Sequence, residues 1–304
     1  MTDLRINSDM LECFESGFDP RRPKRCAIPA RVLAHGKGCT ILVLEHPEAE
    51  GLVFKRMAIF HSETEAERYE ALLHTYIHTL SEDIGIQIVP CATAHVRTPV
   101  RDHWAVYIIQ QRMPEAAIGH TLIASLPPDE MNRLTMAALE QTAKVFDFNR
   151  AHLDQLELGI DGRISNWAVA ELDPANPALS HRVKLYYLDV GTPLMRRAGV
   201  EQYEPTPLLR SFPAVMRPFV RRAFLPDLMT RYYDFRRVTL DLLSSILKEG
   251  YAEFLPMLAD SVNWFFLAER QEMHFQPLTV QEIVAYHRRD AWLWRAYLTL
   301  RRSR

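Results

Sequence analysis

The sequence predicts an α+β protein in which a small antiparallel β-rich unit precedes a larger, mainly helical one. Three observations support this fold class. Short apolar runs bounded by turn residues dominate the first hundred residues, helical spacing of apolar residues begins near Pro127, and nearly everything beyond Pro226 has helical character. At 304 residues, the chain is long enough for two units or for one bilobal domain.

The β-rich unit is predicted to contain five strands and one helix. The helix begins after Ser62, which can cap its N-terminus with Glu65 three residues later, and its apolar pattern continues to about residue 80. The predicted strands lie at residues 31–36, 39–46, 51–57, 86–96 and 103–111.

The helical unit begins with a long predicted helix over 127–152, whose Pro-Pro-Asp-Glu start is typical of a helix N-terminus. A short β pair is predicted at 164–170 and 183–190. The boundary between the units is placed at Met113–Pro114, where a strand ends in a turn. The expected domains are therefore 1–113, with 1–30 as an extension, and 114–304.

Composition excludes several classes of function. A formal net charge of -2 argues against a large nonspecific attraction to nucleic acid or anionic lipid. The four cysteines are far apart in the sequence and lack the spacing of zinc ligands. The N-terminal residues lack a secretion signal and no apolar run is long enough to span a membrane, so a cytoplasmic protein is expected.

The strongest chemical signal is the segment from Asp161 to Asn166 together with Asp189, which ends the second strand of the predicted β pair. Asp161 can orient a hydroxyl nucleophile, and Arg163 can offset the charge of a moving phosphoryl group. Asn166 and Asp189 supply the oxygen ligands that Mg²⁺ prefers. Gly191 lets the backbone turn away after Asp189. The alternative is that Asp161 belongs to an ordinary turn and Asp189 simply ends a strand.

The β-rich unit carries candidate nucleotide-binding residues. Gly36 and Gly38 flank Lys37 between two strands, where backbone N–H groups can approach phosphate oxygens. Lys55 lies in an otherwise apolar strand and can hold the α- and β-phosphates if a carboxylate orients it. Glu67 on the following helix is the first choice of partner, and Glu70 remains an alternative. A turn, a solvent-facing lysine and a solvated acidic face are the simpler interpretations.

The order of these motifs resembles the protein-kinase-like superfamily. The stretches IIQQRMPEAAIGHTL and LPPDEMNRLTMAALEQTAKVFDF are most similar to the aminoglycoside and choline phosphotransferase branch. The resemblance implies a bilobal fold, ATP and Mg²⁺ as cofactors, and a small-molecule acceptor. It further implies Lys55 and Glu67 as the nucleotide-orienting pair, Asp161 as catalytic base with Arg163 beside the phosphate, and Asn166 and Asp189 as metal ligands.

The same resemblance places the adenine along the linker after the last strand, with main-chain hydrogen bonds from Gln111 and Met113. It also suggests that Asp234 is a buried acid tying a long helix to the catalytic loop. The sequence departs from the family at Gly159, where His or Tyr is usual, and lacks the third glycine of the glycine-rich loop. A pseudokinase that senses nucleotide therefore remains an alternative, as does an unrelated scaffold.

Arginine and aromatic residues are concentrated between residues 208 and 237. One interpretation is a pocket for an acidic or phosphorylated acceptor, and another is an electrostatic patch for a membrane or nucleic acid. The third is a set of helix surfaces whose arginines lie around a core. The arginines are Arg210, Arg217, Arg221, Arg222, Arg231, Arg236 and Arg237.

Overall fold

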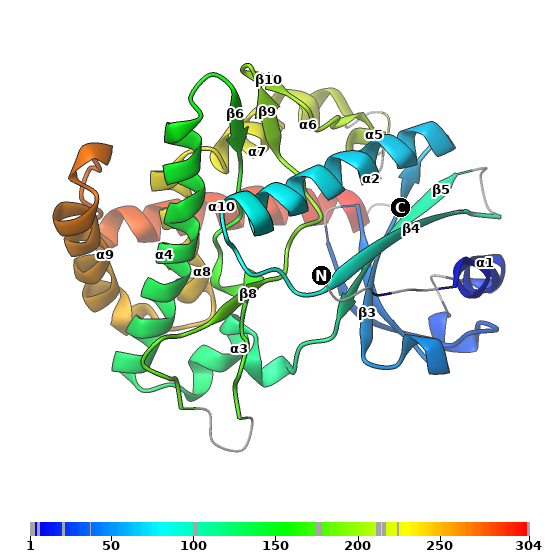
Figure 1. Ribbon diagram of the computed structural model, residues 1–304, viewed down its shortest axis with the longest axis horizontal. Coiled ribbons are helices and arrows are strands. Elements are labelled where there is room, and N and C mark those ends of the chain that lie inside the picture. The colour runs from blue at the N-terminus through cyan, green and yellow to red at the C-terminus, as the bar shows by residue number, and fades with distance from the viewer. Residues whose placement is uncertain are drawn as a thin grey trace.

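Five strands of the N-terminal part form one antiparallel sheet in the order β1-β2-β3-β5-β4, as the computed structural model shows (Figure 1). The structure describes residues 4, 7–19, 22–36, 38–99, 103–173, 178–210, 214, 217–223 and 225–302. The strands are β1 (Ala30–His35), β2 (Thr40–Leu44), β3 (Leu52–Phe60), β4 (Cys91–Arg97) and β5 (Trp104–Gln111). Their alternating apolar residues had predicted all five.

The sheet separates two apolar clusters because successive side chains of a strand point to opposite faces. In β5, Val106 and Ile108 join the large core of the molecule, whereas Tyr107 and Ile109 join a second, smaller core. Helix α2 (Glu63–His78) packs on the first face, and helix α1 (Ser8–Gly17) packs on the other. Helix α1 lies within residues 1–30, for which the sequence had predicted only an extension.

Local capping explains where α1 and α2 begin. The Ser62 hydroxyl accepts a hydrogen bond from the Glu65 amide at 3.2 Å, as the sequence had predicted. The Glu65 carboxylate accepts from the amide of His61, one residue before the cap. At α1, the Asn7 side chain accepts from the Asp9 amide at 2.9 Å. The same signal, an Asn before an acidic first turn, was present in the sequence and could have revealed α1.

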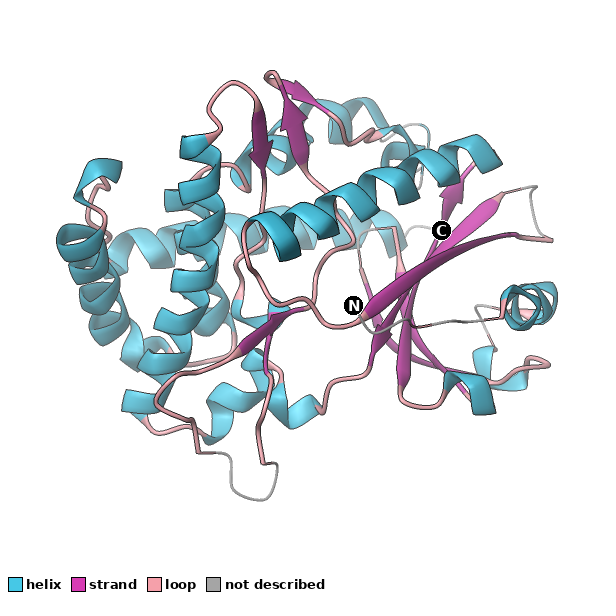
Figure 2. Cartoon of the chain, in the orientation of Figure 1, coloured by secondary structure: helices cyan, strands magenta, loops and turns pink. Residues whose placement is uncertain are grey.

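The remainder of the chain is mainly helical, in agreement with the predicted α+β class (Figure 2). The long helix α4 has ten buried residues, seven of which belong to the large core, and it starts with Pro128, as a helix N-terminus favours. The helices of this part are α3 (Gly119–Leu122), α4 (Pro128–Ala151), α5 (Thr206–Arg210), α6 (Arg217–Ala223), α7 (Leu225–Arg231), α8 (Phe235–Lys248), α9 (Leu255–Glu269) and α10 (Val280–Arg302).

Two small sheets hold the loops that carry the candidate chemistry. The predicted β pair exists in shorter form as β7 (Trp167–Val169) and β8 (Leu185–Tyr187), preceded by a 3-10 turn at Ile164–Asn166. A second sheet, which the sequence had not predicted, joins β6 (Leu156–Leu158), β9 (Met195–Arg197) and β10 (Val200–Glu201). The loops 159–166 and 188–194 therefore each connect one small sheet to the other.

No helix among the described residues combines the length and the apolarity needed to cross a bilayer.

Candidate active site

Lys55 and Asp189 meet in a direct ion pair, although 134 positions separate them in the sequence. The Lys55 ammonium lies 2.5 Å from the Asp189 carboxylate, and their side chains are 18% and 27% exposed. Burial lowers the pKa of Lys55, but the charge and hydrogen bond of Asp189, together with the charges of Cys39 and Asp161, more than offset it and leave this pKa raised, so the lysine is cationic at neutral pH. A Cβ at position 191 would lie 2.7 Å from Lys55 Cε, which explains the need for Gly191.

Asp161 lies in the loop after β6 and is 8% exposed. The Arg163 guanidinium binds both carboxylate oxygens of Asp161, with Nε at 2.8 and 3.1 Å and Nη2 also in contact with Oδ2. The Asp161 charge strongly raises the pKa of Arg163, so this pair is ionised. Asp161 is thus a buried carboxylate held by a neighbouring cation, a contact that the sequence had not predicted, since it had placed Arg163 beside the transferring phosphate.

Asn166 connects the two loops of the site. Its side-chain amide nitrogen donates to the backbone carbonyl of Asp161 at 3.0 Å. Its backbone carbonyl accepts from the backbone amide of Leu188 at 2.9 Å. The buried Gln110 side chain at the end of β5 donates to the Leu188 carbonyl at 3.1 Å. Hydrogen bonds therefore link the segments of Asp161, Asn166 and Asp189, and the ion pair adds Lys55.

The donor set of this site fits a hard divalent cation. Asp189 supplies a carboxylate that is partly accessible, and Asn166 has its amide nitrogen turned to Asp161, so its oxygen is the atom left to act as a ligand. Carboxylate and amide oxygens are the ligands that Mg²⁺ prefers, together with phosphate and water. Asp189 and Asn166 are the residues that would hold it.

Lys55 is paired with Asp189 and not with Glu67 or Glu70, so the predicted partner was wrong. Glu70 accepts a hydrogen bond from His95 Nδ1 at 2.6 Å, and Glu67 lies exposed beside Glu63 and His95. The reason is the rotation of α2, whose buried face carries Ala66, Tyr69, Leu73 and Tyr76. That face directs Tyr69 toward the site, where its hydroxyl donates to the Gly191 carbonyl at 2.9 Å.

The glycine turn lies at the tip of the β1–β2 hairpin, and Lys37 is outside the described residues. The Gly36 amide donates to the Cys39 carbonyl at 3.0 Å, so it closes the turn. Gly38 has a φ of 72°, which favours glycine, and a Cβ there would lie 3.1 Å from Leu208 Cδ1. Helix α5 of the helical part thus reaches over this turn. No pattern in the sequence indicated that contact.

The two linker residues predicted to contact a nucleotide follow β5. The Gln111 amide donates to the Pro90 carbonyl at 3.0 Å, so only the Gln111 carbonyl can serve an adenine. A main-chain hydrogen bond from Gln111 to a nucleotide, as the sequence predicted, could therefore involve only its carbonyl group. Met113 is half-buried and precedes Pro114 and the 3-10 turn at Glu115–Ala117.

The sequence departs at Gly159 from the superfamily that it resembles, and this glycine is closely packed. A Cβ there would lie 3.0 Å from the Leu194 Cβ and 3.3 Å from the Tyr232 Cβ. The Gly159 carbonyl accepts a hydrogen bond from Tyr76 of α2 at 2.7 Å. A larger residue at this position would displace the start of the Asp161 loop.

The buried acid behind the site is Asp241, not Asp234. Asp234 is exposed and caps α8 by accepting from the Arg237 amide at 3.1 Å. Asp241, about two turns further along α8, is 3% exposed, and burial raises its pKa to about 6 against the opposing charge of Arg231. The next turn of α8 contacts the loop of Asp161 directly, because the Ser245 hydroxyl accepts from the Ile164 amide at 3.0 Å.

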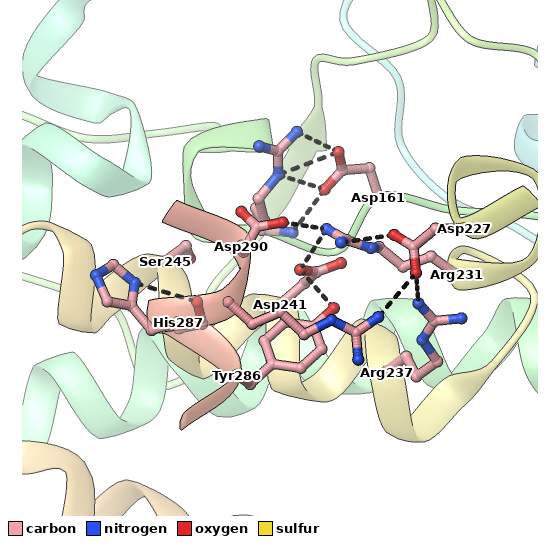
Figure 3. A network of polar contacts seen from close by, with 12 residues as sticks. Asp161, Asp227, Arg231, Arg237, Asp241, Ser245, Tyr286, His287 and Asp290 are labelled. Carbon is pink, nitrogen blue, oxygen red and sulfur yellow. Dashed lines mark hydrogen bonds and ion pairs between the residues drawn. The ribbon is translucent and has the colours of Figure 1, made fainter. Parts of the chain in front are cut away.

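Figure 3 shows Asp241 within an ionic network that lies beneath Asp161. Arg231 binds Asp227 at 2.8 Å, Asp290 at 2.8 Å and Asp241 at 3.3 Å, and the Tyr286 hydroxyl donates to Asp241 at 3.0 Å.

Arg237 also binds Asp227, and Arg236 binds Glu282 on α10. Most arginines of this segment therefore join helices to one another, while Arg221 and Arg222 are exposed on α6.

Comparisons with known proteins give low similarity to solved structures. WaaP in complex with acyl carrier protein is similar over 87% of this chain and 88% of that chain, with a TM-score of 0.42 and 12% identity. A crystal structure of WbdD is similar over 84% of this chain and 50% of that chain, with a TM-score of 0.30 and 15% identity. This chain therefore spans about half the length of WbdD. No curated protein sequence matches significantly.

The sequence itself matches one family profile over residues 37–304. That range begins within the glycine turn and includes Lys55, Asp161, Asn166 and Asp189, but it leaves out α1. The chain therefore belongs to the family described as a family of unknown function, DUF6206.

Proposed function

We propose that this chain is an ATP- and Mg²⁺-dependent phosphotransferase that moves the γ-phosphoryl group to a hydroxyl of a small molecule. The proposal includes a bilobal, protein-kinase-like arrangement, with residues 1–113 as the nucleotide-binding lobe and 114–304 as the catalytic and acceptor-binding lobe. The branch of aminoglycoside and choline phosphotransferases is the one that its sequence pattern resembles most.

One observation carries the proposal: a lysine from the sheet, two acids and an amide converge from segments far apart in the sequence. Lys55 reaches Asp189 at 2.5 Å, and Asn166 bonds to both the Asp161 carbonyl and the Leu188 amide. A lysine beside a metal-binding carboxylate can contact the α- and β-phosphates, and a second carboxylate can accept the proton of the attacking hydroxyl. Bound Mg²⁺ would neutralise charge on the phosphate oxygens.

Each residue then has a definite task. Asp161 aligns the acceptor hydroxyl and accepts its proton, and Arg163 orients that carboxylate while offering N–H groups to the transferring phosphate. Lys55 turns from Asp189 toward the phosphates when nucleotide enters. Asp189 and Asn166 are the metal ligands of the proposal, and Gly36 and Gly38 let the turn approach the phosphates.

Turnover of ATP tests the proposal. ATP consumption with a panel of hydroxyl metabolites is expected for the wild type and should fall by about 10²–10⁴-fold in Asp161→Asn, because a general base contributes that much. Binding of MgATP should persist in this variant, since Asp161 faces the acceptor. Absence of MgATP binding by the wild type would falsify the proposal.

A nucleotide-sensing pseudokinase is the second candidate, and a specific observation favours it. Both acids of the site are already engaged by cations, Asp161 by Arg163 and Asp189 by Lys55. A site that binds nucleotide without releasing Asp161 from Arg163 would have no free base. Tight MgATP binding with no turnover on any acceptor, unchanged in Arg163→Gln, would support the sensor.

A further inference from the structure

Helix α2 touches both loops of the candidate site through two buried tyrosines. Tyr69 and Tyr76 are seven positions apart and lie on the same face of the helix, 7% and 1% exposed. The Tyr69 hydroxyl donates to the Gly191 carbonyl at 2.9 Å, two residues after Asp189. The Tyr76 hydroxyl donates to the Gly159 carbonyl at 2.7 Å, two residues before Asp161.

The sequence had predicted that a carboxylate of α2 would contact Lys55. The α2 side chains that contact the two loops are instead these tyrosines. No carboxylate of α2 reaches Lys55 among the described residues, and the lysine is instead bound to Asp189. A rotation of α2 therefore cannot change the geometry of the site through an ion pair between this helix and Lys55. The tyrosine hydroxyls connect the helix to the two loops in a different way, through hydrogen bonds to the backbone of each loop.

The electrostatics agree with a donor role for both phenols. Burial, followed by nearby negative charges that include Asp189, raises the pKa of Tyr69 and of Tyr76, so each hydroxyl keeps its proton at neutral pH. A protonated, buried phenol is a fixed hydrogen-bond donor with little rotational freedom. The two loops also bond to each other, because the Gly159 amide donates to the Leu194 carbonyl at 2.9 Å.

We propose that Tyr69 and Tyr76 are positioning residues that fix the spacing between the proposed metal ligand Asp189 and the proposed base Asp161. Tyr69 acts on the Asp189 loop, and Tyr76 acts on the Asp161 loop. The proposal rests on the proposed function for its chemical consequence, but the mechanical link is testable without nucleotide. Movement of α2 relative to the helical part would then change both loops together.

Tyr69→Phe and Tyr76→Phe test the link, because each removes one hydroxyl and keeps the ring in the core. Tyr107→Phe is the matched control, since Tyr107 is equally buried but its hydroxyl donates to Glu15 on the far face of the sheet. Hydrogen–deuterium exchange of the protein without ligand is expected to rise in residues 189–194 for Tyr69→Phe. It should rise in residues 156–163 for Tyr76→Phe, and in neither segment for Tyr107→Phe.

The chemical arm uses MgATP as the probe. Tyr69→Phe should raise the Mg²⁺ concentration for half-maximal ATP-dependent thermal stabilisation by about tenfold, as loss of groups that orient ligands does. Tyr76→Phe should leave that concentration unchanged and lower kcat instead. A general loss of stability would not separate metal dependence from kcat in this way.

The outcomes separate the inference from the proposed function. If both tyrosine variants show the exchange of Tyr107→Phe, or if each raises exchange equally in both segments, the inference is overturned, whatever the chain binds. If the exchange pattern holds but the wild type does not bind MgATP, the proposed function fails while the link from α2 to the loops stands.

Discussion

Lys55 and Arg56 are neighbours in β3, yet they form ion pairs of opposite character on the two faces of one sheet. Lys55 meets Asp189 where both side chains remain partly accessible, at 18% and 27%. Arg56 meets Glu15 of α1, which is 2% exposed and accepts from Arg56 at 2.5 and 2.9 Å and from Tyr107 at 2.5 Å. The difference shows that a charged residue in an apolar strand can form a buried ion pair within a core or can remain accessible to a ligand.

The number of fixed partners explains this contrast. Glu15 has three N–H or O–H donors and almost no water, so its charge is compensated only while the fold is intact. Asp189 has one cationic partner and access to water, so a metal or phosphate can replace that contact at moderate cost. Breaking each pair should therefore affect stability in the first case and ligand binding in the second.

The largest effect is expected for Glu15→Ala, which leaves the Arg56 guanidinium buried without its partner. The free energy of unfolding should fall by about 3–5 kcal/mol, as it does when one member of a buried pair is removed. Urea unfolding measures this change. Glu171→Ala is the matched control, because its pair with Lys184 is exposed and should contribute about 0–1 kcal/mol.

Replacing the whole cluster on the α1 face sharpens that test. The triple variant Glu15→Leu, Arg56→Met and Tyr107→Phe leaves no charge or hydroxyl without a partner. It should regain most of the stability lost in Glu15→Ala, since buried pairs can be exchanged for apolar residues at little cost. A triple variant as unstable as Glu15→Ala would show that the loss came from packing.

Lys55→Ala should act on ligand binding. MgATP at 100 times its dissociation constant is expected to stabilise the wild type by about 2.7 kcal/mol, and most of that should vanish in the variant. Stability without ligand should change by no more than about 1 kcal/mol, because Asp189 can be hydrated. Thermal unfolding with and without MgATP measures both quantities.

Glu67→Ala is the control for this prediction, because Glu67 is exposed and away from Lys55. Its MgATP-dependent stabilisation should equal that of the wild type. Equal losses in Glu67→Ala and Lys55→Ala would mean that the lysine changes partner when nucleotide binds and would reinstate the pairing that the sequence had predicted.

Asp241 offers a third carboxylate, as buried as Glu15 but placed behind Asp161. Its pKa is raised to about 6 from 3.8, so between these values the folded state binds a proton that the unfolded state does not. Its contribution to stability is therefore fully present below pH 3.8 and is lost as pH rises through 6. Two pKa units at 1.36 kcal/mol each amount to roughly 2–3 kcal/mol.

Urea unfolding of the wild type and Asp241→Asn between pH 4 and pH 7 measures this contribution. The stability of the wild type relative to the variant should increase as the pH falls from 6 to 4. Parallel curves for the two proteins would contradict a raised pKa at Asp241.

The smallest effect is expected for Tyr107→Phe alone. Glu15 keeps both contacts to Arg56, so the loss should be that of one hydrogen bond, about 0.5–1.5 kcal/mol. MgATP-dependent stabilisation should not change. A large loss in this variant would indicate that the phenol, and not the guanidinium, compensates the Glu15 charge.

Several parts of the fold could be predicted because their cause is local. Alternation of apolar residues defined the five strands, and the Ser62 cap with Glu65 defined the start of α2. Helix α1 was missed although its Asn7 cap is a local signal, because its apolar face is short and packs only against the sheet that it covers. The strands β6, β9 and β10 have two or three residues each, which is too short for a period to be recognised.

The sequence named the candidate site residues but not how they pair. The spacing of Asp161, Arg163 and Asn166 was visible because one loop carries all three, and the Arg163–Asp161 contact follows from that proximity. The partner of Lys55 depended on which face of α2 turns inward, and three glutamates shared the other side of the helix. A shift of one position, about 100°, separates Tyr69 from Glu70.

The sequence by itself determined most of the longer strands and helices and named the side chains whose chemistry suits phosphate or metal, because those properties depend on residue type and short-range spacing. Only the tertiary structure decided that Lys55 meets Asp189, that α1 compensates Arg56 through Glu15, and that two tyrosines of α2 hold the loops. These contacts depend on how helices rotate and pack on the sheet, and that rotation is set by the sum of many distant apolar contacts.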